Sequence, residues 1–269
     1  MFTAKIAVAC GLGAGIAVGA IAGLSVSIRR AGSIADLSAR VATIEDRLVS
    51  IQAFGAGRTE VGPSPLADRS LTLDLAESAT KGNLEARVAL IEFTDPQCPF
   101  CGRFARETFN SIDKEFVLPG RVLYAIRFFP IERIHPFALV ASEFLYCARE
   151  QNRFWDLHHV LFGSQRLARS ELLGQASSVG LDVKRLAECA DGPAEEKVRR
   201  DAAEATRIGV HSTPTFVLAA KHDKRWVAQQ MIVGAQSIDT FRHYLSAALA
   251  DHKRATPASG TRDGLNSAP

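Results

Sequence analysis

Two cysteines separated by two residues, in Cys98-Pro99-Phe100-Cys101, have the spacing that most directly indicates chemistry. A strand-like run precedes them and a helix-like pattern follows. One thiol therefore stands in the first turn of a helix and the other a turn later, near enough to close a reversible disulfide. Unpaired N–H groups and the positive end of the helix dipole favour a thiolate at Cys98, so we expect its pKa to lie below the free value of about 8.5. Cys98 is the predicted attacking cysteine and Cys101 the predicted resolving one.

The alternative for an isolated CxxC pair is half of a zinc site, which needs four ligands. The sequence offers no obvious second half. His158 and His159 are adjacent, so on a helix they face different directions, and Cys147 and Cys189 are far apart in the sequence. The pattern therefore favours a redox pair that needs no metal and no cofactor.

Two further positions are candidates for the same site. Glu92 lies inside an apolar run shortly before Cys98, and a buried carboxyl there would have a raised pKa suited to moving a proton to or from Cys101. The alternative is a strand-end glutamate that reaches solvent. Thr213-Pro214 opens a strand, where a cis bond would present the Thr213 backbone to an extended peptide. An ordinary trans proline of an edge strand is the alternative.

The elements that must position these residues alternate between strand and helix patterns over residues 71–250, which predicts an α/β fold. A helical segment at about residues 131–207 interrupts the strands. The predicted order is a strand at 88–93, a helix with its apolar side at Cys101, Phe104, Thr108, Ile112 and Phe116, a strand at 122–129, helices from 136 to 207, strands at 215–219 and 225–233, and a helix that Ser237 caps and that runs to 249.

Residues 6–28 contain no charged side chain and are long enough to cross a bilayer as a helix. They predict a transmembrane anchor within residues 1–30 or a signal peptide cleaved near Ala20-Ile21-Ala22, and the length of the apolar run favours the uncleaved anchor. Basic residues flank both sides, so charge alone does not decide the orientation. Cys10 is interpreted as a small residue inside the anchor rather than as a lipid-attachment site.

Apolar residues at spacings of three and four follow the anchor, within residues 31–53. They predict a short coiled coil that joins copies of the chain, or a single amphipathic helix. These positions are Ile34, Leu37, Val41, Ile44, Leu48 and Ile51. Gly, Pro, Ser and charged residues then predict a flexible linker at 54–70, and a similar composition predicts a disordered tail at 251–269. The net charge of +3, without a block of one sign, excludes nucleic acid as the expected partner.

A set of short motifs, ordered along residues 71–250, resembles the DsbA-like thioredoxin family. The motifs are CPFC after a strand with Glu92, Phe129-Pro130, His135-Pro136, Cys147-Ala148, Phe154-Trp155 with His158, Leu161-Phe162, Gly209-Val210 and Thr213-Pro214-Thr215-Phe216. The resemblance implies a thioredoxin-like fold with an inserted helical subdomain and a catalyst of disulfide exchange. It further implies Cys98 as nucleophile, Pro214 as the cis-proline, and Thr213, Pro99 and Phe100 beside it for substrate binding.

The resemblance also implies a location and partners. The amino terminus would lie inside the cytoplasmic membrane and the domain outside it, in the periplasm or an equivalent space. Exported proteins with thiols or disulfides would be the substrates, and a membrane redox partner would recycle the cysteine pair. Family members often carry a second cysteine pair in the insertion, so Cys147 and Cys189 are expected to form a structural disulfide, with two buried free thiols as the alternative.

Two departures from the resemblance concern the direction of exchange. Phe100 stands where the strongest oxidants have a histidine between the cysteines, and Thr213 is similar to the residue used by disulfide isomerases. Oxidase and isomerase both stay open, and a metal-handling or cytochrome-maturation dithiol protein is the second hypothesis. His135, His158, Phe154 and Trp155 are expected to pack and cap, and His211 to lie in a loop.

Overall fold

The computed structural model describes residues 64–65, 71–223 and 225–255. The predicted anchor at 6–28 and the predicted heptad segment at 34–51 lie outside the described residues, as do most of the linker at 54–70 and of the tail at 251–269. Within the described ranges, no helix combines the length and the apolar character needed to cross a membrane.

Strands and helices alternate through the described chain, as the sequence pattern predicts. The strands are β1 (Ser64–Pro65), β2 (Thr72–Leu73), β3 (Ala79–Lys81), β4 (Val88–Thr94), β5 (Val122–Phe128), β6 (Thr215–His222) and β7 (Arg225–Val233). The helices are α2 (Pro99–Glu107), α3 (Phe109–Ile112), the π-helical turn η1 (Asp113–Val117), α4 (Ala138–Glu150), α5 (Phe154–Ser164), α6 (Arg169–Ser178), α7 (Val183–Ala190), α8 (Ala194–Arg207) and α9 (Ile238–Ala255).

The strands of the described residues form one mixed sheet in the order β1-β7-β6-β4-β5-β3, with β2 also paired to β7. β4 pairs with β5 in parallel and with β6 in antiparallel orientation, and β6 pairs with β7 in antiparallel orientation. β4 is therefore a central strand, and all seven of its residues are buried. This explains its continuous apolar run, because a strand covered on both faces has no need of polar alternation.

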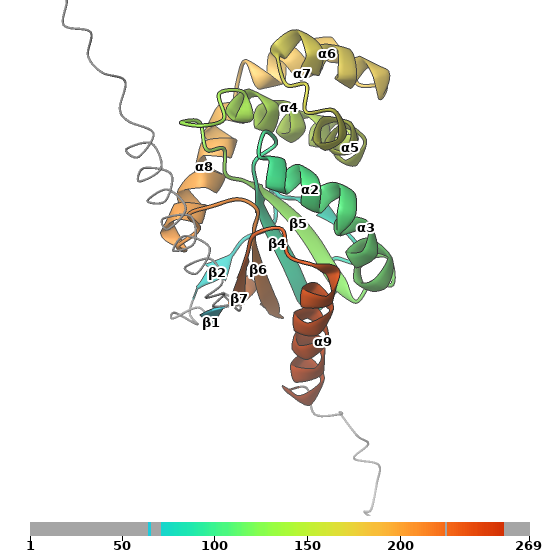
Figure 1. Cartoon of the computed structure of the whole chain (residues 1–269), viewed down its shortest axis with the longest axis vertical. Helices are drawn as coiled ribbons and strands as arrows, with labels where there is room; N and C mark the ends of the chain where they lie inside the picture. The colour runs from blue at the N-terminus through green and yellow to red at the C-terminus, as the bar shows by residue number, and fades with distance from the viewer. Residues whose placement is uncertain (1–63, 66–70, 224, 256–269) are drawn as a thin grey trace, which may run out of the picture. The chain divides into compact units, whose positions relative to one another are not determined.

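The two faces of the sheet have separate cores. Val88 and Leu90 of β4 belong to a core that includes α2, α3 and α9, whereas Ala89 and Ile91 belong to a second core that includes the end of α8. Figure 1 shows α2 and α3 on one side of the strands and α8 on the other. Successive side chains of a strand point to opposite faces, so the position of a residue along β4 decides which helices it meets.

Helices α4 to α8 lie between β5 and β6 in the chain and form the helical insertion of a thioredoxin-like α/β fold, as predicted. In Figure 1, α4 to α7 are grouped at the top, beyond α2, while α9 lies at the opposite end of the molecule. The Sγ atoms of Cys147 on α4 and Cys189 on α7 are bonded to each other, at 2.04 Å. The arrangement in Figure 1 places the insertion at the end of the sheet at which β4 leads into α2.

Three boundaries differ from the sequence-based expectation. The helix expected to continue to Phe116 is divided into α2, α3 and η1, and the wider π turn lets the adjacent Phe116 and Val117 both enter the core. α9 continues to Ala255 rather than ending at 249, since no proline follows until position 257. Residues 64–65, inside the predicted linker, pair with β7, whose edge offers free backbone groups.

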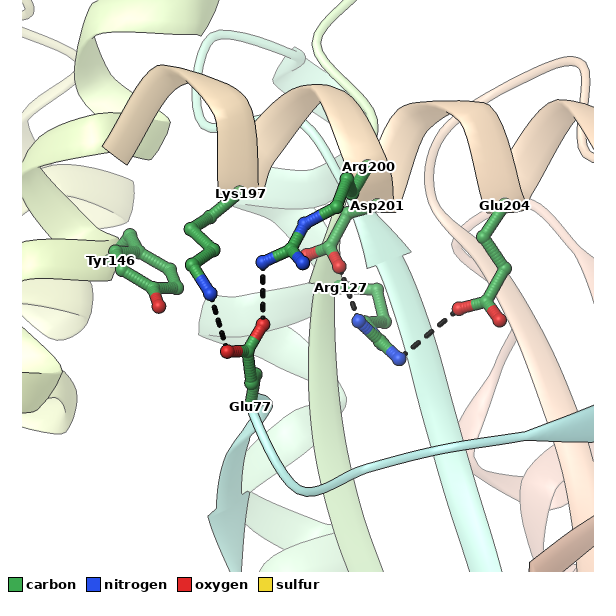
Figure 2. A pocket seen from close by; sticks show the side chains of 7 residues that line it. All are labelled: Glu77, Arg127, Tyr146, Lys197, Arg200, Asp201 and Glu204. Carbon is green, nitrogen blue, oxygen red and sulfur yellow. Dashed lines mark hydrogen bonds and ion pairs between the residues drawn. The ribbon is translucent and has the colours of Figure 1, made fainter. Parts of the chain in front are cut away.

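A charged cluster joins the insertion to the sheet where α8 passes over β5 (Figure 2). Arg127 on β5 pairs with Asp201 and, at 3.1 Å, with Glu204, and Asp201 also accepts the Phe128 N–H at 3.1 Å. The cluster consists of Glu77, Arg127, Lys197, Arg200, Asp201 and Glu204, with Tyr146 beside them. Because its three basic and three acidic side chains balance, the cluster is a structural contact rather than a binding site for an ion of one sign.

Candidate active site

The register of β4 aims Glu92 at the helix that carries the cysteines. Val88 and Leu90 lie in the core under α2, so Glu92 and Thr94, which continue the same alternation, face that side as well. α2 begins directly after a short loop at the end of β4, and its Cys101 belongs to the same core. The strand therefore brings the predicted carboxylate beneath the predicted thiol pair.

Cys98 is the N-cap residue of α2, and Pro99 occupies the first helical turn. Its backbone is extended, with φ −69° and ψ 122°, and no side chain caps the helix. The free N–H groups of that turn can therefore donate to the Cys98 sulfur. Proline has no N–H, and at position 99 an N–H would have no partner within the helix. Both Cys98 and Cys101 are free thiols, 4% and 0% exposed.

The segment before β6 reaches the same sulfur from across the sheet. The Thr213–Pro214 peptide bond is cis, and Pro214 is buried. When it is protonated, the Cys98 thiol donates to the Thr213 carbonyl, with a separation of 3.4 Å between Sγ and O, although the two residues are 115 positions apart. The structure therefore brings together Cys98, Cys101, Thr213 and Pro214, as the sequence hypothesis requires.

Opposite pKa shifts separate the roles of the two cysteines. The hydrogen bond from the Cys101 thiol is the largest cause that lowers the pKa of Cys98 to about 5. The Thr213 side chain and the N–H groups of Cys101 and Phe100 lower this pKa further, whereas burial raises it. The Thr213 hydroxyl is buried and has no geometrically satisfied hydrogen bond within the described residues. Burial raises the pKa of Cys101 well above its ordinary value. Cys98 is therefore ionised at neutral pH, whereas Cys101 keeps its proton.

Glu92 is a buried acid that can change its charge near neutral pH. Only 2% of its surface is exposed, and the Tyr124 hydroxyl donates to its Oε2. Burial raises the pKa of Glu92 to about 7, although hydrogen bonds from Tyr124 and Thr94 lower it in part. The Glu92 charge in turn raises the pKa of Cys101. The carboxyl thus interacts electrostatically with the thiol for which we expect it to relay a proton.

Asp95 was not recognised in the sequence, yet it organises the loop before Cys98. Its carboxylate is fully buried and accepts from the Gln97 N–H at 2.8 Å, the Ile131 N–H at 2.8 Å and His135 Nδ1 at 2.7 Å. Its backbone carbonyl accepts the Cys98 N–H at 3.0 Å. An Asp-Pro pair is typical of a turn, but it gives no sign of the partners, which come from a separate loop. Asp95 and His135 together fix the start of α2.

The remaining aromatic and histidine candidates have packing and structural roles. Trp155 donates its Nε1–H to the Thr80 carbonyl at 3.2 Å and stacks on Phe109. His158 packs against Phe162 with ring centroids 4.3 Å apart, and burial lowers the pKa of His158 to about 3, so its ring is neutral. His211 is exposed in the loop before Thr213.

Three exposed apolar side chains belong to the start of α2 and to the loop that is hydrogen-bonded to the turn before Cys98. Phe100 is 54% exposed, and Ile134 and Phe137, in the loop that Asp95 holds, are 57% and 44% exposed. The Phe137 N–H donates to Gln97 Oε1 at 2.7 Å, which ties this loop to the turn before Cys98. The loop that carries Ile134 and Phe137 is thus held beside the residues that lead into Cys98.

The first prediction concerns alkylation of the reduced protein. The rate of reaction of Cys98 with iodoacetamide should rise through pH 5 and level off below pH 7, because the thiolate reacts and the Cys98 pKa is about 5. Cys101 should stay unmodified over this range. Peptide mass spectrometry after timed quenching distinguishes the two sites, and an apparent pKa near that of free cysteine would contradict the assignment.

The fold and this site define a class of protein, the thiol-disulfide oxidoreductases with a thioredoxin-like fold and a helical insertion. A family model described as thioredoxin matches residues 75–242, and the chain belongs to this family. The match spans every element from the turn before β3 into α9, including both cysteines and Thr213-Pro214.

Solved structures agree on the fold. DsbA1 of Wolbachia pipientis superposes with a TM-score of 0.61 at 22% identity, over 70% of this chain and 98% of that one. BdbD of Bacillus subtilis, in its oxidised form, gives a TM-score of 0.58 at 21% identity, over 66% and 96%. A thioredoxin-like oxidoreductase from Silicibacter pomeroyi gives 0.54 at 24% identity, over 67% and 94%. The fold is therefore DsbA-like.

Curated relatives match by sequence over a shorter stretch. A protein named Na⁺/H⁺ antiporter NhaA 1, from Salinispora arenicola, is 31% identical over 153 residues, which are 56% of this chain and 23% of the relative. A second antiporter, from Herminiimonas arsenicoxydans, is 34% identical over 143 residues, or 52% and 22%. The chain spans about a quarter of the length of these relatives, and the activity in their names is that of the whole proteins.

Proposed function

We propose that the protein exchanges disulfides with exported proteins, with Cys98 as the nucleophile and Cys101 as the resolving thiol. The observation that supports this most directly is the Cys98 sulfur at the start of α2. It lies against the Thr213 carbonyl, and the Cys98 pKa is lowered to about 5. A thiolate that persists at neutral pH attacks disulfides and leaves mixed disulfides readily.

Oxidation of a client proceeds in two displacements. A client thiolate attacks Cys98 Sγ of the oxidised pair, the bond between Cys98 and Cys101 breaks, and Cys101 leaves as a thiolate that takes a proton from Glu92. A second client thiolate then attacks the client sulfur of the mixed disulfide, and Cys98 leaves as a thiolate. The client loses two electrons and the cysteine pair gains them. Isomerisation uses the same mixed disulfide without net transfer.

Client binding is assigned to the surface around Cys98. The Thr213 backbone, which precedes β6, is placed to pair with an extended client segment as an added strand, next to Pro214. Pro99 and Phe100 border the sulfur on the other side, and both are exposed. Backbone pairing together with apolar contact suits unfolded segments of varied sequence, which agrees with a substrate class of exported proteins still acquiring disulfides.

The acidity of Cys98 supports net oxidation over reduction. Thiolate stabilisation favours the reduced pair and so makes the disulfide more oxidising. A Cys98 pKa of about 5 lies between the values of about 7 for thioredoxin and about 3.5 for DsbA. We therefore expect a reduction potential between about −270 and about −120 mV. Phe100 provides no histidine to raise the oxidising strength further.

The proposed location and the remaining partners depend on the sequence of segments that lie outside the described residues. We propose that residues 6–28 anchor the chain in the cytoplasmic membrane, with the catalytic domain on the periplasmic side and a membrane redox partner that recycles the pair. Residues 34–51 would join copies of the chain, which suits an isomerase, and residues 54–70 would link this segment to the domain.

The test is reduction of insulin by dithiothreitol in the presence of the purified protein. The matched control is the same protein alkylated at pH 6, where Cys98 is ionised and Cys101 is not. The untreated protein should speed insulin precipitation at least several-fold, and the alkylated protein should behave like buffer. Equal rates for both would refute the proposed exchange activity. Stoichiometric copper or zinc binding without turnover would instead support the metal-handling hypothesis.

A further inference from the structure

Tyr124 is a buried neighbour of Glu92 and has no role in the exchange steps proposed for Cys98, Cys101 and Glu92. The register pairs Leu90 with Tyr124 and Glu92 with Ile126, so Tyr124 and Glu92 project from adjacent strands onto the same face. The Tyr124 hydroxyl donates to Glu92 Oε2. Tyr124 is 1% exposed and Glu92 is 2% exposed. A phenol and a carboxyl thus interact with each other in a space that water does not reach.

The surroundings of Tyr124 fix its ring while leaving its hydroxyl to Glu92. Its centroid lies 4.6 Å from the Phe109 ring and 5.9 Å from the Trp155 ring. Trp155 is itself held by its hydrogen bond to Thr80. Burial raises the pKa of Tyr124 well above its ordinary value, so the hydroxyl stays protonated and acts as a donor. The aromatic packing therefore holds a hydrogen-bond donor in a fixed position against one carboxyl oxygen.

We propose that Tyr124 is a positioning residue for proton transfer between Glu92 and Cys101: its hydroxyl binds one carboxyl oxygen, fixes the orientation of the carboxyl beneath α2 and stabilises its ionised form. This inference rests on the proposed exchange function, since it assigns a residue that governs the proton step of the same site.

The step in question is resolution of the mixed disulfide by the reduced enzyme. Glu92, as the carboxylate, accepts the proton of the Cys101 thiol. The Cys101 thiolate attacks Cys98 Sγ, the bond between Cys98 and the client sulfur breaks, and the client leaves as a thiolate. Cys101 cannot ionise without help at neutral pH, because its pKa is raised well above that of a free thiol. The fraction of Glu92 in the carboxylate form therefore sets the rate of this step.

The groups that face Glu92 come from three elements. Tyr124 approaches from β5, Cys98 and Cys101 from the start of α2, and Thr94 from β4 itself. On β6 its pairing partner is the uncharged Phe216. Asp113 of η1 interacts with Tyr124 rather than with Glu92. Tyr124 is thus the hydrogen-bond donor that favours the carboxylate, with a smaller contribution from the nearby Thr94 side chain, against burial and the Cys98 charge.

The experiment is the pH profile of Tyr124→Phe. A quenched dimer of two fluorescent peptides joined by a disulfide is mixed with excess reduced protein, and release of the second peptide reports resolution by Cys101. Loss of a hydrogen bond to a charged group should move the rising limb of this profile, set in the wild type by the Glu92 pKa, upward by about one pH unit. The Glu92 pKa is about 7 in the reduced protein and lower in the mixed disulfide, where Cys98 no longer carries the charge that raises it. The variant should then be about tenfold slower at pH 6 and nearly equal at pH 9.

Two controls separate positioning from packing. Tyr146→Phe removes the hydroxyl of another buried tyrosine, one that accepts from Arg149, and should leave the profile unchanged. In a Glu92→Gln background the Tyr124→Phe change should have no further effect on the limb. The proposal is overturned if Tyr124→Phe slows resolution equally in the wild-type and Glu92→Gln backgrounds, or if it leaves the rising limb of the pH profile in place. If the wild type itself shows no exchange, the proposed function fails instead.

A second variant covers the case in which Tyr124→Phe does not fold. Incorporation of 3-fluorotyrosine at position 124 keeps the ring and the hydroxyl but makes the hydroxyl a stronger donor. The rising limb should then move to lower pH, and the δ-carbon of Glu92 should titrate at a correspondingly lower pH in carbon-13 NMR. A limb and a titration that stay in place overturn the proposal.

Discussion

Cys101→Ser is expected to stop the protein halfway through exchange, so that mixed disulfides between Cys98 and client proteins accumulate. Capture should survive, because the hydrogen bond from residue 101 is the largest cause of the low Cys98 pKa, and serine also donates one. Resolution should fail, because a serine hydroxyl does not displace a sulfur from a disulfide. Turnover in insulin reduction should fall by a factor on the order of 10³ or more.

Non-reducing electrophoresis and intact mass spectrometry measure this trapping. Two further variants serve as controls for the trapping. Cys98→Ser should give no covalent complex and no turnover, since the accessible nucleophile is gone. Cys101→Ala should capture clients more slowly than Cys101→Ser below pH 7, because alanine donates no hydrogen bond and the Cys98 pKa rises. Turnover of Cys101→Ser close to the wild-type rate would mean that clients resolve themselves, and the role assigned to Cys101 would be wrong.

The α/β layout and the outline of the site were predictable because their signals are local, whereas the resemblance to the DsbA-like family implied the thioredoxin-like fold. CPFC after an apolar strand defines a thiol pair at a helix start from a few adjacent residues. The apolar character of residues 88–93, broken only by Glu92, predicted a buried strand, and β4 is the central strand there. The helical character of residues 136–207 predicted the inserted helices, and Gly180 and Gly192-Pro193 lie between them, because glycine is a poor helix former and proline lacks the N–H that a helix interior needs.

The contacts that complete the site depend on register between segments far apart in the chain. Tyr124 looked like one residue of an apolar strand, and only the parallel pairing of β4 with β5 places it beside Glu92. His135 lies 40 positions from Asp95, and no periodicity links the two. The strands β2 and β3, of two and three residues, are too short to produce a detectable pattern. Sequence patterns report on neighbours along the chain, whereas these contacts arise from packing.

The charged cluster of Figure 2 carries the largest expected effect on stability, through Asp201→Asn. The Asp201 carboxylate accepts from Arg127 on one oxygen and from the Phe128 N–H on the other. Asparagine has a single acceptor oxygen, so its NH₂ group must face one of these two donors. The side chains of Arg127 and Asp201 are only 11% and 12% exposed, so water does not replace the lost partner. Removing one member of a buried pair costs about 3–5 kcal/mol, and we expect the lower end of this range because Arg127 keeps its ion pair with Glu204.

Urea unfolding of the oxidised protein measures this cost, and a neighbouring ion pair supplies the matched control. Glu77→Gln breaks contacts to Lys197 and Arg200 in the same cluster, but the Glu77 side chain is 49% exposed and solvent screens its charge. Its loss should cost less than about 1 kcal/mol. Arg127→Met should cost less in the Asp201→Asn background than in the wild type, by about 1–3 kcal/mol. Similar costs for Asp201→Asn and Glu77→Gln would mean that burial of the Arg127 pair does not stabilise the contact between α8 and β5.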